Sequence, residues 1–297
     1  MSLFTKRITA VVTAGALLTA GMAQPAVARE QAGNVIEVVG TSAGFTMRDS
    51  NSAGQVTFTV SSSHPQGGLF ALWTLRPTAT LDDALPYAKM GLSDTRSESI
   101  AGGRGLQQRV EVLGGAAVLP GQPVSFTAQL RPGTYYLVNY QDFREGGVPQ
   151  AAARLHTLTI TNRYSPAPPP LAHATAVFTL ANGKAAYWMP TQLRRGQPLR
   201  MINATPQLSE AVFMPVRPGT TQEQMRQFFA AADKEEWDVD VPFTGGPVGL
   251  PALSPNHTTI IQTALQPGLY ALVTWYPDFR TGRMLAAEGK FELVTIV

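Results

Sequence analysis

The stretch RPGTYYLVNYQDFR at residues 131–144 recurs later in the chain as QPGLYALVTWYPDFR at residues 266–280. Both copies open on a Pro-Gly pair, which is typical of a tight turn, and continue in a run of Tyr, Leu and Val, which favours a strand. Both then end on Asp-Phe-Arg. Two stretches that share this many residues in the same order predict an internal duplication.

Further pairs keep the same order around these two stretches. They are Gly54-Gln55 with Gly196-Gln197, Arg76-Pro77 with Arg217-Pro218, and Gly114-Gly115 with Gly245-Gly246. Between the copies lies SPAPPP at residues 165–170, a composition that favours a stiff, extended spacer. The sequence therefore predicts one domain at 34–162, a Pro-rich linker at 163–173 and a second domain at 174–297.

Each predicted domain consists mostly of strands. Residues 56–60 alternate apolar side chains with threonine, which is the period-two pattern of a half-buried strand. One helix is expected in each copy, the first after Thr80 with Asp83 at the third position, the second after Thr220 with Glu223. Strands with a single short helix, repeated twice, predict an all-β chain of two tandem Greek-key β-sandwiches.

The first 28 residues have the three parts of an export signal. Lys6-Arg7 is a short basic start, residues 8–20 are apolar but too few for a stable membrane anchor, and Ala26-Val27-Ala28 is a cleavage pattern. We expect cleavage near Ala28, which leaves a secreted protein beginning at Arg29. No later stretch reaches 18 uninterrupted apolar residues, so no membrane span is expected.

Composition narrows the possible chemistry. The 297 residues include no cysteine, which excludes disulfides, thiolate metal ligands and cysteine nucleophiles. The formal charge of +3 becomes +1 without residues 1–28, because that segment holds two of the 23 Lys and Arg and none of the 20 Asp and Glu. No basic run longer than Arg194-Arg195 remains, so nucleic-acid binding is not expected.

A resemblance to a known family follows from the repeated stretch. Gly-x-Tyr-x-Leu-Val-x near the end of each copy, then a loop and a final Phe/Leu/Val strand, resembles the secreted bacterial plastocyanin-like (cupredoxin) proteins. The resemblance implies a cupredoxin-like fold for both copies. In that family a cysteine four residues after the Tyr binds type 1 copper, with a His and often a Met from the next loop and a further His from earlier in the domain.

The copper ligands that this resemblance implies are missing from the sequence. The cysteine position holds Asn139 in the first copy and Thr274 in the second, and the histidine position of the next loop holds Gln150 and Leu285. Neither an amide nor an aliphatic side chain can replace imidazole and thiolate as soft ligands. The resemblance therefore implies two degenerate copper sites, and we expect no cofactor.

Two alternatives remain from the sequence. His64 lies near the region of the early copper ligand, and Met284 lies in the second loop, so a copper-handling protein with His and Met ligands is conceivable, since methionine suits Cu(I). A hydrolytic enzyme is a more distant alternative, because the chain has no phosphate-binding loop and no dinucleotide fingerprint after a strand. We assign no catalytic residue.

Asp-Phe-Arg is the one polar motif found in both copies. Its members are Asp142, Phe143 and Arg144 in the first copy and Asp278, Phe279 and Arg280 in the second. As a recognition loop, the motif would offer an arginine fork to a carboxylate or glycan. As a structural turn, it would use Asp to accept backbone N–H groups and Phe to close the end of the sandwich. The structural interpretation is favoured.

These observations together predict an exported, non-enzymatic binding or structural protein made of two copper-free cupredoxin-like domains. The expected partner is an envelope protein or a glycan. Copper handling and hydrolysis stay as the alternatives.

Overall fold

The computed structural model describes residues 34–145, 155–181 and 184–297. The predicted signal peptide and Gln150 lie outside these ranges. Within them, no helix is both long and apolar enough to cross a membrane. We refer to β1–β8 with α2–α4 as the first half and to β9–β17 with α5 as the second half.

Both halves consist mostly of strands, with helices inserted partway along the chain. The first half contains β1 (Val35–Thr41), β2 (Gly44–Thr46), β3 (Ser50–Ser62), β4 (Gly68–Leu75), α2 (Leu81–Gly91), α3 (Arg96–Arg109), β5 (Val110–Val118), β6 (Val124–Leu130), β7 (Gly133–Asn139), α4 (Tyr140–Glu145) and β8 (Leu155–Ser165). The second half contains β9 (Ala174–Ala181), β10 (Lys184–Trp188), β11 (Gln192–Leu193), β12 (Leu199–Asn203), β13 (Ser209–Pro215), α5 (Gln222–Asp233), β14 (Val248–Leu253), β15 (Thr258–Thr263), β16 (Gly268–Val273) and β17 (Phe291–Ile296).

The two halves also share one pattern of strand pairing. In the first half β1 is parallel to β3, β3 is antiparallel to β6, and β4 lies between β5 and β7, which in turn pairs with β8. The second half repeats these pairs. There β9 is parallel to β12, β12 is antiparallel to β15, and β13 lies between β14 and β16, which in turn pairs with β17. The prediction of an all-β fold with two cupredoxin-like Greek-key sandwiches is confirmed.

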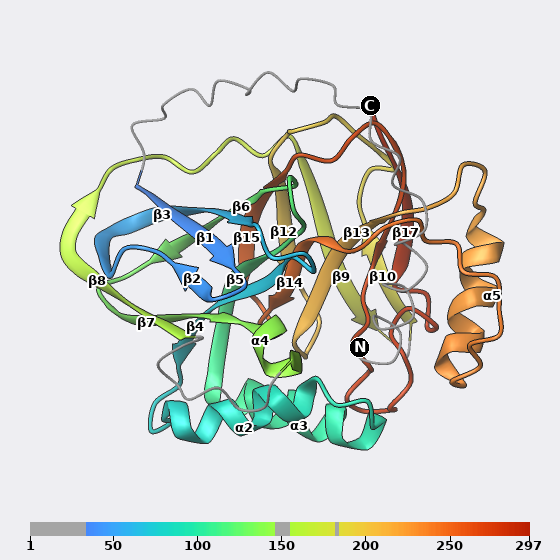
Figure 1. Ribbon diagram of the computed structural model, residues 1–297, viewed down its shortest axis with the longest axis horizontal. Coiled ribbons are helices and arrows are strands. Elements are labelled where there is room, and N and C mark those ends of the chain that lie inside the picture. The colour runs from blue at the N-terminus through green and yellow to red at the C-terminus, as the bar shows by residue number, and fades with distance from the viewer. Residues whose placement is uncertain (1–33, 146–154, 182–183) are drawn as a thin grey trace.

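The two sandwiches are joined edge to edge. We call β2, β1, β3, β6, β15, β12, β9 and β10 sheet A, and β8, β7, β4, β5, β14, β13, β16 and β17 sheet B. Sheet A crosses between the halves where β6 pairs with β15, from Thr127 opposite Ile260 to Val124 opposite Thr263. Sheet B crosses where β5 meets β14, with Ala117 opposite Gly249. Both layers therefore run through the whole molecule (Figure 1).

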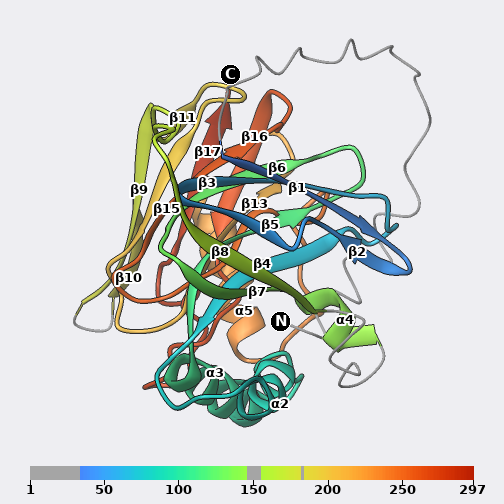
Figure 2. The same ribbon diagram turned by 90° about the vertical axis from the view of Figure 1, so that its left-hand side faces the viewer.

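Two apolar clusters stabilise these layers. One fills the space between sheets A and B and runs through both halves, from Phe58 and Phe126, whose rings stack at 4.6 Å, to Phe178 and Phe213. The other covers the outer face of sheet B and includes the inner faces of the helices. Figure 2 shows α2 and α3 side by side beneath sheet B, with α5 beyond them. Among the described residues, the helices thus form a layer on the outer face of sheet B.

The helices differ from the sequence prediction in two respects. The first half has two packed helices, α2 and α3, where one was expected, and α4 forms where a turn was expected. The expected capping box of Thr80 and Asp83 is present at α2. At α5 the N-cap is Thr221, paired with Gln224, and the predicted cap Thr220 instead donates to the carbonyl of Arg217 at 2.7 Å.

The repeated Pro-Gly-x-Tyr turns have the same geometry in both halves. Gly133 and Gly268 have φ values of 154° and 153°, a region that side chains other than glycine rarely enter. The hydroxyl of Tyr135 donates to the carbonyl of Arg131 at 2.9 Å and so closes the first turn. The predicted match of Gly114-Gly115 with residues 245–246 is wrong. In the first half Gly115 lies opposite Ala71, and the equivalent pair in the second half is Gly249 opposite Val212. The counterpart of Gly115 is therefore Gly249.

Helix α3 of the first half forms hydrogen bonds with the second half. Arg96 donates to a carboxylate oxygen of Asp233 at 3.0 Å, and Asp233 is the last residue of α5. Gln107 donates to the carbonyl of Pro206 at 3.0 Å and accepts the amide hydrogen of Leu208 at 2.8 Å. Because the partners come from both halves, these contacts fix one half against the other.

Candidate functional site

The two predicted copper positions of the second half are buried and filled by side chains that bind metals poorly. Thr274 follows β16, is 0% exposed, and its hydroxyl accepts the amide hydrogen of Tyr276 at 3.2 Å. Leu285, also 0% exposed, donates its amide to the carbonyl of Tyr276 at 3.1 Å, and its own carbonyl accepts the amide of Lys290 at 2.9 Å. The loop from β16 to β17 therefore closes on itself around an aliphatic side chain.

A buried ammonium group lies next to this loop. Lys290 directly precedes β17 and is 0% exposed, and its Nζ donates to the hydroxyl of Ser209 on β13. The same Nζ lies 5.0 Å from the ring centre of Phe178 and 5.2 Å from that of Tyr187. Ring faces at this distance attract a cation, most strongly where water is excluded. Residues of both sheets thus surround the ammonium group.

The second member of this cluster is Glu210, which is also 0% exposed. One carboxylate oxygen accepts the amide hydrogen of Trp275, and the carbonyl of Glu210 accepts the hydroxyl of Tyr187 at 2.5 Å. The other carboxylate oxygen has no hydrogen-bond partner within the described ranges. The hydroxyl of Tyr187 also interacts with Thr274, so the predicted cysteine position is part of the same cluster.

Burial disfavours the charged form of both side chains. It raises the pKa of Glu210 to about 7, against the hydrogen bond from Trp275 and the charge of Lys290, which lower it. Burial lowers the pKa of Lys290 to about 7, while the charge of Glu210 raises it. Each group therefore depends on the other to stay charged inside the sandwich.

The first half has an uncharged counterpart of this site. Asn139, at the predicted cysteine position, accepts the amide hydrogens of Leu69 at 3.0 Å and of Gln141 at 3.3 Å through its side-chain oxygen. Gln141 in turn donates to Gln66 at 2.8 Å. The carbonyl oxygen of the Asn139 side chain is thus committed to backbone N–H groups. Gln150, the predicted histidine position, falls outside the described residues.

The two weak metal candidates have different surroundings. His64 lies between β3 and β4, where its Nδ1 accepts the amide hydrogen of Gln66 at 3.1 Å. Met284 lies between β16 and β17, and its amide donates to Asp233 at 2.7 Å. Across residues 34–145, 155–181 and 184–297, no group of three or more His, Asp or Glu side chains is placed to hold a metal ion.

The second Asp-Phe-Arg motif forms a closed turn against the first half. Asp278 is 1% exposed and accepts the amide hydrogen of Arg280 at 2.7 Å. Phe279 is buried, and its carbonyl accepts the guanidinium of Arg104 from α3. The Arg280 side chain is 70% exposed. The turn therefore buries its aspartate and phenylalanine, while the arginine side chain is directed to solvent.

The first Asp-Phe-Arg motif is part of α4. Phe143 is buried and packs near Tyr140, with ring centres 6.5 Å apart. Tyr140 accepts the indole N–H of Trp73 at 3.1 Å, and burial raises the pKa of its hydroxyl. The side chains of Asp142 and Arg144 lie outside the described part of the structure. The two copies of the motif thus adopt different backbones, a helix in one half and a turn in the other.

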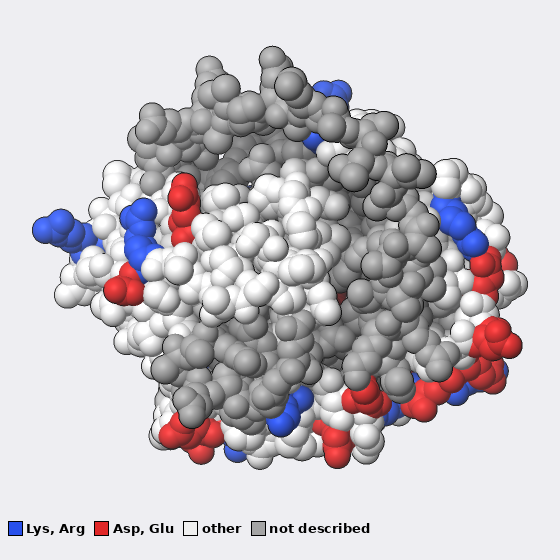
Figure 3. Space-filling model, in the orientation of Figure 1, with Lys and Arg blue, Asp and Glu red and all other residues white. Residues whose placement is uncertain are grey.

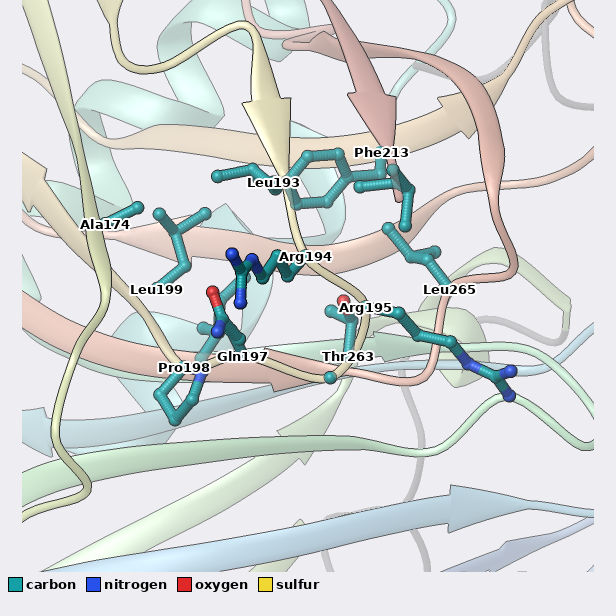
Figure 4. Close-up of a pocket in the computed structure, with 13 residues that line it drawn as sticks. Ala174, Leu193, Arg194, Arg195, Gln197, Pro198, Leu199, Phe213, Thr263 and Leu265 are labelled. Atoms are coloured by element: carbon teal, nitrogen blue, oxygen red, sulfur yellow. The ribbon is translucent and has the colours of Figure 1, made fainter.

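A small pocket opens at the other end of the second half. Figure 4 shows Leu193, Leu199 and Phe213 on its wall, with the Arg194 side chain directed among them and Arg195 directed away. The cavity volume is about 20 Å³, which is room for a single water molecule.

Charged side chains are sparse on the exposed surface. In the view of Figure 3, Lys, Arg, Asp and Glu lie mainly around the rim, and most of the described centre is uncharged. Only 14% of all residues are charged. On the face shown, the described residues form no continuous basic track for a polyanion.

Sequence reasoning missed Glu210 and Lys290. Glu210 begins an otherwise apolar run at 211–216, and Lys290 stands directly before the last apolar strand. A charge at the edge of an apolar strand is the signal that was available. It is weak because most such charges lie in solvent.

Comparison with known proteins gives structural likenesses only. No family model and no curated protein sequence matches the chain. Among solved structures, auracyanin from Roseiflexus castenholzii is similar at 18% identity and a TM-score of 0.25, over 43% of this chain and 99% of its own. A multicopper oxidase is similar at 10% identity and a TM-score of 0.23, over 89% of this chain and 88% of its own.

A third similar structure is the copper-containing nitrite reductase from Thermus scotoductus SA-01, at 13% identity and a TM-score of 0.23. It covers 89% of this chain and 61% of its own. At these TM-scores none of the likenesses supports an argument about copper or catalysis in this chain. The site must be judged on its own residues.

Proposed function

We propose that this chain is an exported, non-enzymatic binding or structural protein in which two copper-free cupredoxin-like halves form one rigid scaffold. The observation that carries the proposal is the set of side chains at the expected ligand positions. Thr274 and Leu285 are fully buried, Asn139 is committed to two backbone amides, and none of the three supplies a soft donor. Type 1 copper does not fit these residues.

The joined sheets support a scaffold role. Pairing of β6 with β15, together with the contacts of α3 at Asp233 and Leu208, opposes movement of one half against the other. A rigid double sandwich presents fixed surfaces to a partner and loses little conformational entropy on binding. The expected partner is an envelope protein or a glycan.

The export part of the proposal rests on residues 1–28. Their basic start, apolar centre and Ala-x-Ala pattern are those of a cleaved signal. Amino-terminal sequencing of the protein recovered from the culture medium is expected to begin at Arg29. Retention of the uncleaved chain in the cells would contradict export.

Metal analysis tests the copper-free part of the proposal. The mature protein is expected to purify without stoichiometric copper and to show no saturable binding when titrated with Cu(I) or Cu(II). The matched controls are His64→Ala and Met284→Ala, which remove the residues best suited to a His and Met site. One tightly bound copper per chain in the unaltered protein, lost in either variant, would favour copper handling instead.

A further inference from the structure

The cluster around Lys290 has the composition of a cation-binding site. Two ring faces, those of Phe178 and Tyr187, and the hydroxyl of Ser209 are directed at one ammonium group. The carboxylate of Glu210 adds a negative charge, and one of its oxygens has no hydrogen-bond partner among the described residues. Aromatic faces, a hydroxyl oxygen and a carboxylate are all groups that stabilise a positive charge.

The hydrogen bonds indicate where the charges lie. Glu210 accepts the backbone N–H group of Trp275, which favours its ionised form. The ring faces and the Ser209 oxygen favour the protonated form of Lys290. These contacts favour a carboxylate on Glu210 near an ammonium group on Lys290.

The cluster lies next to Thr274, and the backbone of Lys290 bonds to Leu285, so it occupies the end of the sandwich that holds the second pair of degenerate copper-ligand positions. We propose that this is a cation site whose occupant is the ammonium group of Lys290, a cation supplied by the chain itself. Shortening this side chain opens the site to a small monovalent cation from solution. The proposal rests on the copper-free function and deepens it, because a fixed positive charge repels a metal ion.

The described part of the first half has no such cluster. The register of β4 against β7 and of β13 against β16 places Leu69 where the second half has Glu210. The corresponding position therefore carries no carboxylate, and the amide of Leu69 bonds to Asn139. Within the described residues, this cluster occurs in the second half and has no counterpart in the first.

Thermal unfolding of three variants tests the proposal. The variants are Lys290→Ala, which removes the ammonium group, Lys290→Met, which replaces it at similar volume, and Glu210→Gln combined with Lys290→Ala. Each is measured at pH 7.5 in ammonium chloride and in N-methylglucamine chloride at equal ionic strength, since only ammonium is small enough for the space that the lysine leaves. The unaltered protein is expected to unfold at the same temperature in both salts.

Lys290→Ala is expected to unfold about 2–4 °C higher in ammonium chloride than in N-methylglucamine chloride. Adding Glu210→Gln is expected to abolish that difference, because the carboxylate that requires a cation is gone. An equal response of Lys290→Ala to both salts, or a difference that persists without the carboxylate, would overturn the proposal.

Lys290→Met gives a second criterion if the alanine variant does not fold. It is expected to unfold at a lower temperature than Lys290→Met combined with Glu210→Gln, since only the single variant leaves a buried carboxylate without a counter-charge. The reverse order would refute the proposal. Copper uptake by the unaltered protein would refute the proposed function and leave this order unchanged, so the two failures are distinguishable.

Discussion

The contact between Gly103 of α3 and Phe279 of the second half can be tested by adding one methyl group. A Cβ atom at Gly103 would lie 2.3 Å from Cζ and 2.6 Å from Cε1 of the Phe279 ring. The ring is buried, so it cannot move away without displacing its neighbours. Overpacking of this kind costs about 1–3 kcal/mol, whereas replacing a helical glycine by alanine gains about 1 kcal/mol.

We therefore expect Gly103→Ala to lower the free energy of unfolding by about 1 kcal/mol in the unaltered protein. In a Phe279→Ala background the same change should raise it by up to about 1 kcal/mol, which gives a coupling near 2 kcal/mol between the two residues. Urea unfolding of the four proteins in the cycle measures these values.

Gly91→Ala is the matched control for this cycle. Its Cβ would approach nothing closer than 3.6 Å, so its effect should be the same in both backgrounds. Equal effects of Gly103→Ala with and without the Phe279 ring, within about 0.5 kcal/mol, would refute the packing of this loop against α3.

Three further predictions concern stability. Burial holds the pKa of Glu210 near 7 against its usual 4.5, so the folded state binds this proton more tightly, and its contribution to stability falls as the pH rises from 4.5 to 7. Urea unfolding across this range should show a loss of at most about 3 kcal/mol that is smaller in Glu210→Gln, and identical pH profiles would contradict it. Thr221→Ala should cost about 1 kcal/mol by removing the cap of α5, and unchanged stability would show that Thr221 is not the cap. Tyr140→Phe should cost about 1–3 kcal/mol because it leaves the buried indole N–H of Trp73 without its acceptor; a neutral effect in denaturant unfolding would contradict that bond.

The strands were predictable because their signals are local. Alternating residues at 56–60 and the Pro-Gly-x-Tyr turns specify strand and turn without reference to the rest of the chain. The joining of β6 to β15 was not predictable, since it pairs residues 124–127 with 260–263 and depends on register between distant segments. The predicted domain boundaries remain predictions.

Helix α3 shows how packing overrides local preference. Its centre contains three glycines, a composition that predicts a loop. In the structure an added Cβ at Gly102 would meet the backbone of Gly91 at 2.1 Å, and one at Gly105 would meet the ring of Tyr87 at 2.1 Å. The glycines let α3 approach α2 and the second half closely, and tertiary contacts then stabilise the helix.

Of the candidate site, only the lack of copper ligands was predictable from the sequence. The absence of cysteine and the residues Thr274 and Leu285 follow directly from the sequence. The group that fills the region does not, because a sequence pattern cannot distinguish a buried lysine from an exposed one. Lys290 and Glu210 lie 80 positions apart in the chain and come together only when β17 and β13 pack in the same half.

Copper titration of the purified mature protein tests the central claim most directly. Titration calorimetry with Cu(I) and Cu(II), accompanied by metal analysis of the protein as isolated, is expected to show no stoichiometric copper and no saturable heat. Isolation with one copper per chain, or saturable binding at a ratio of one to one, would contradict the copper-free account.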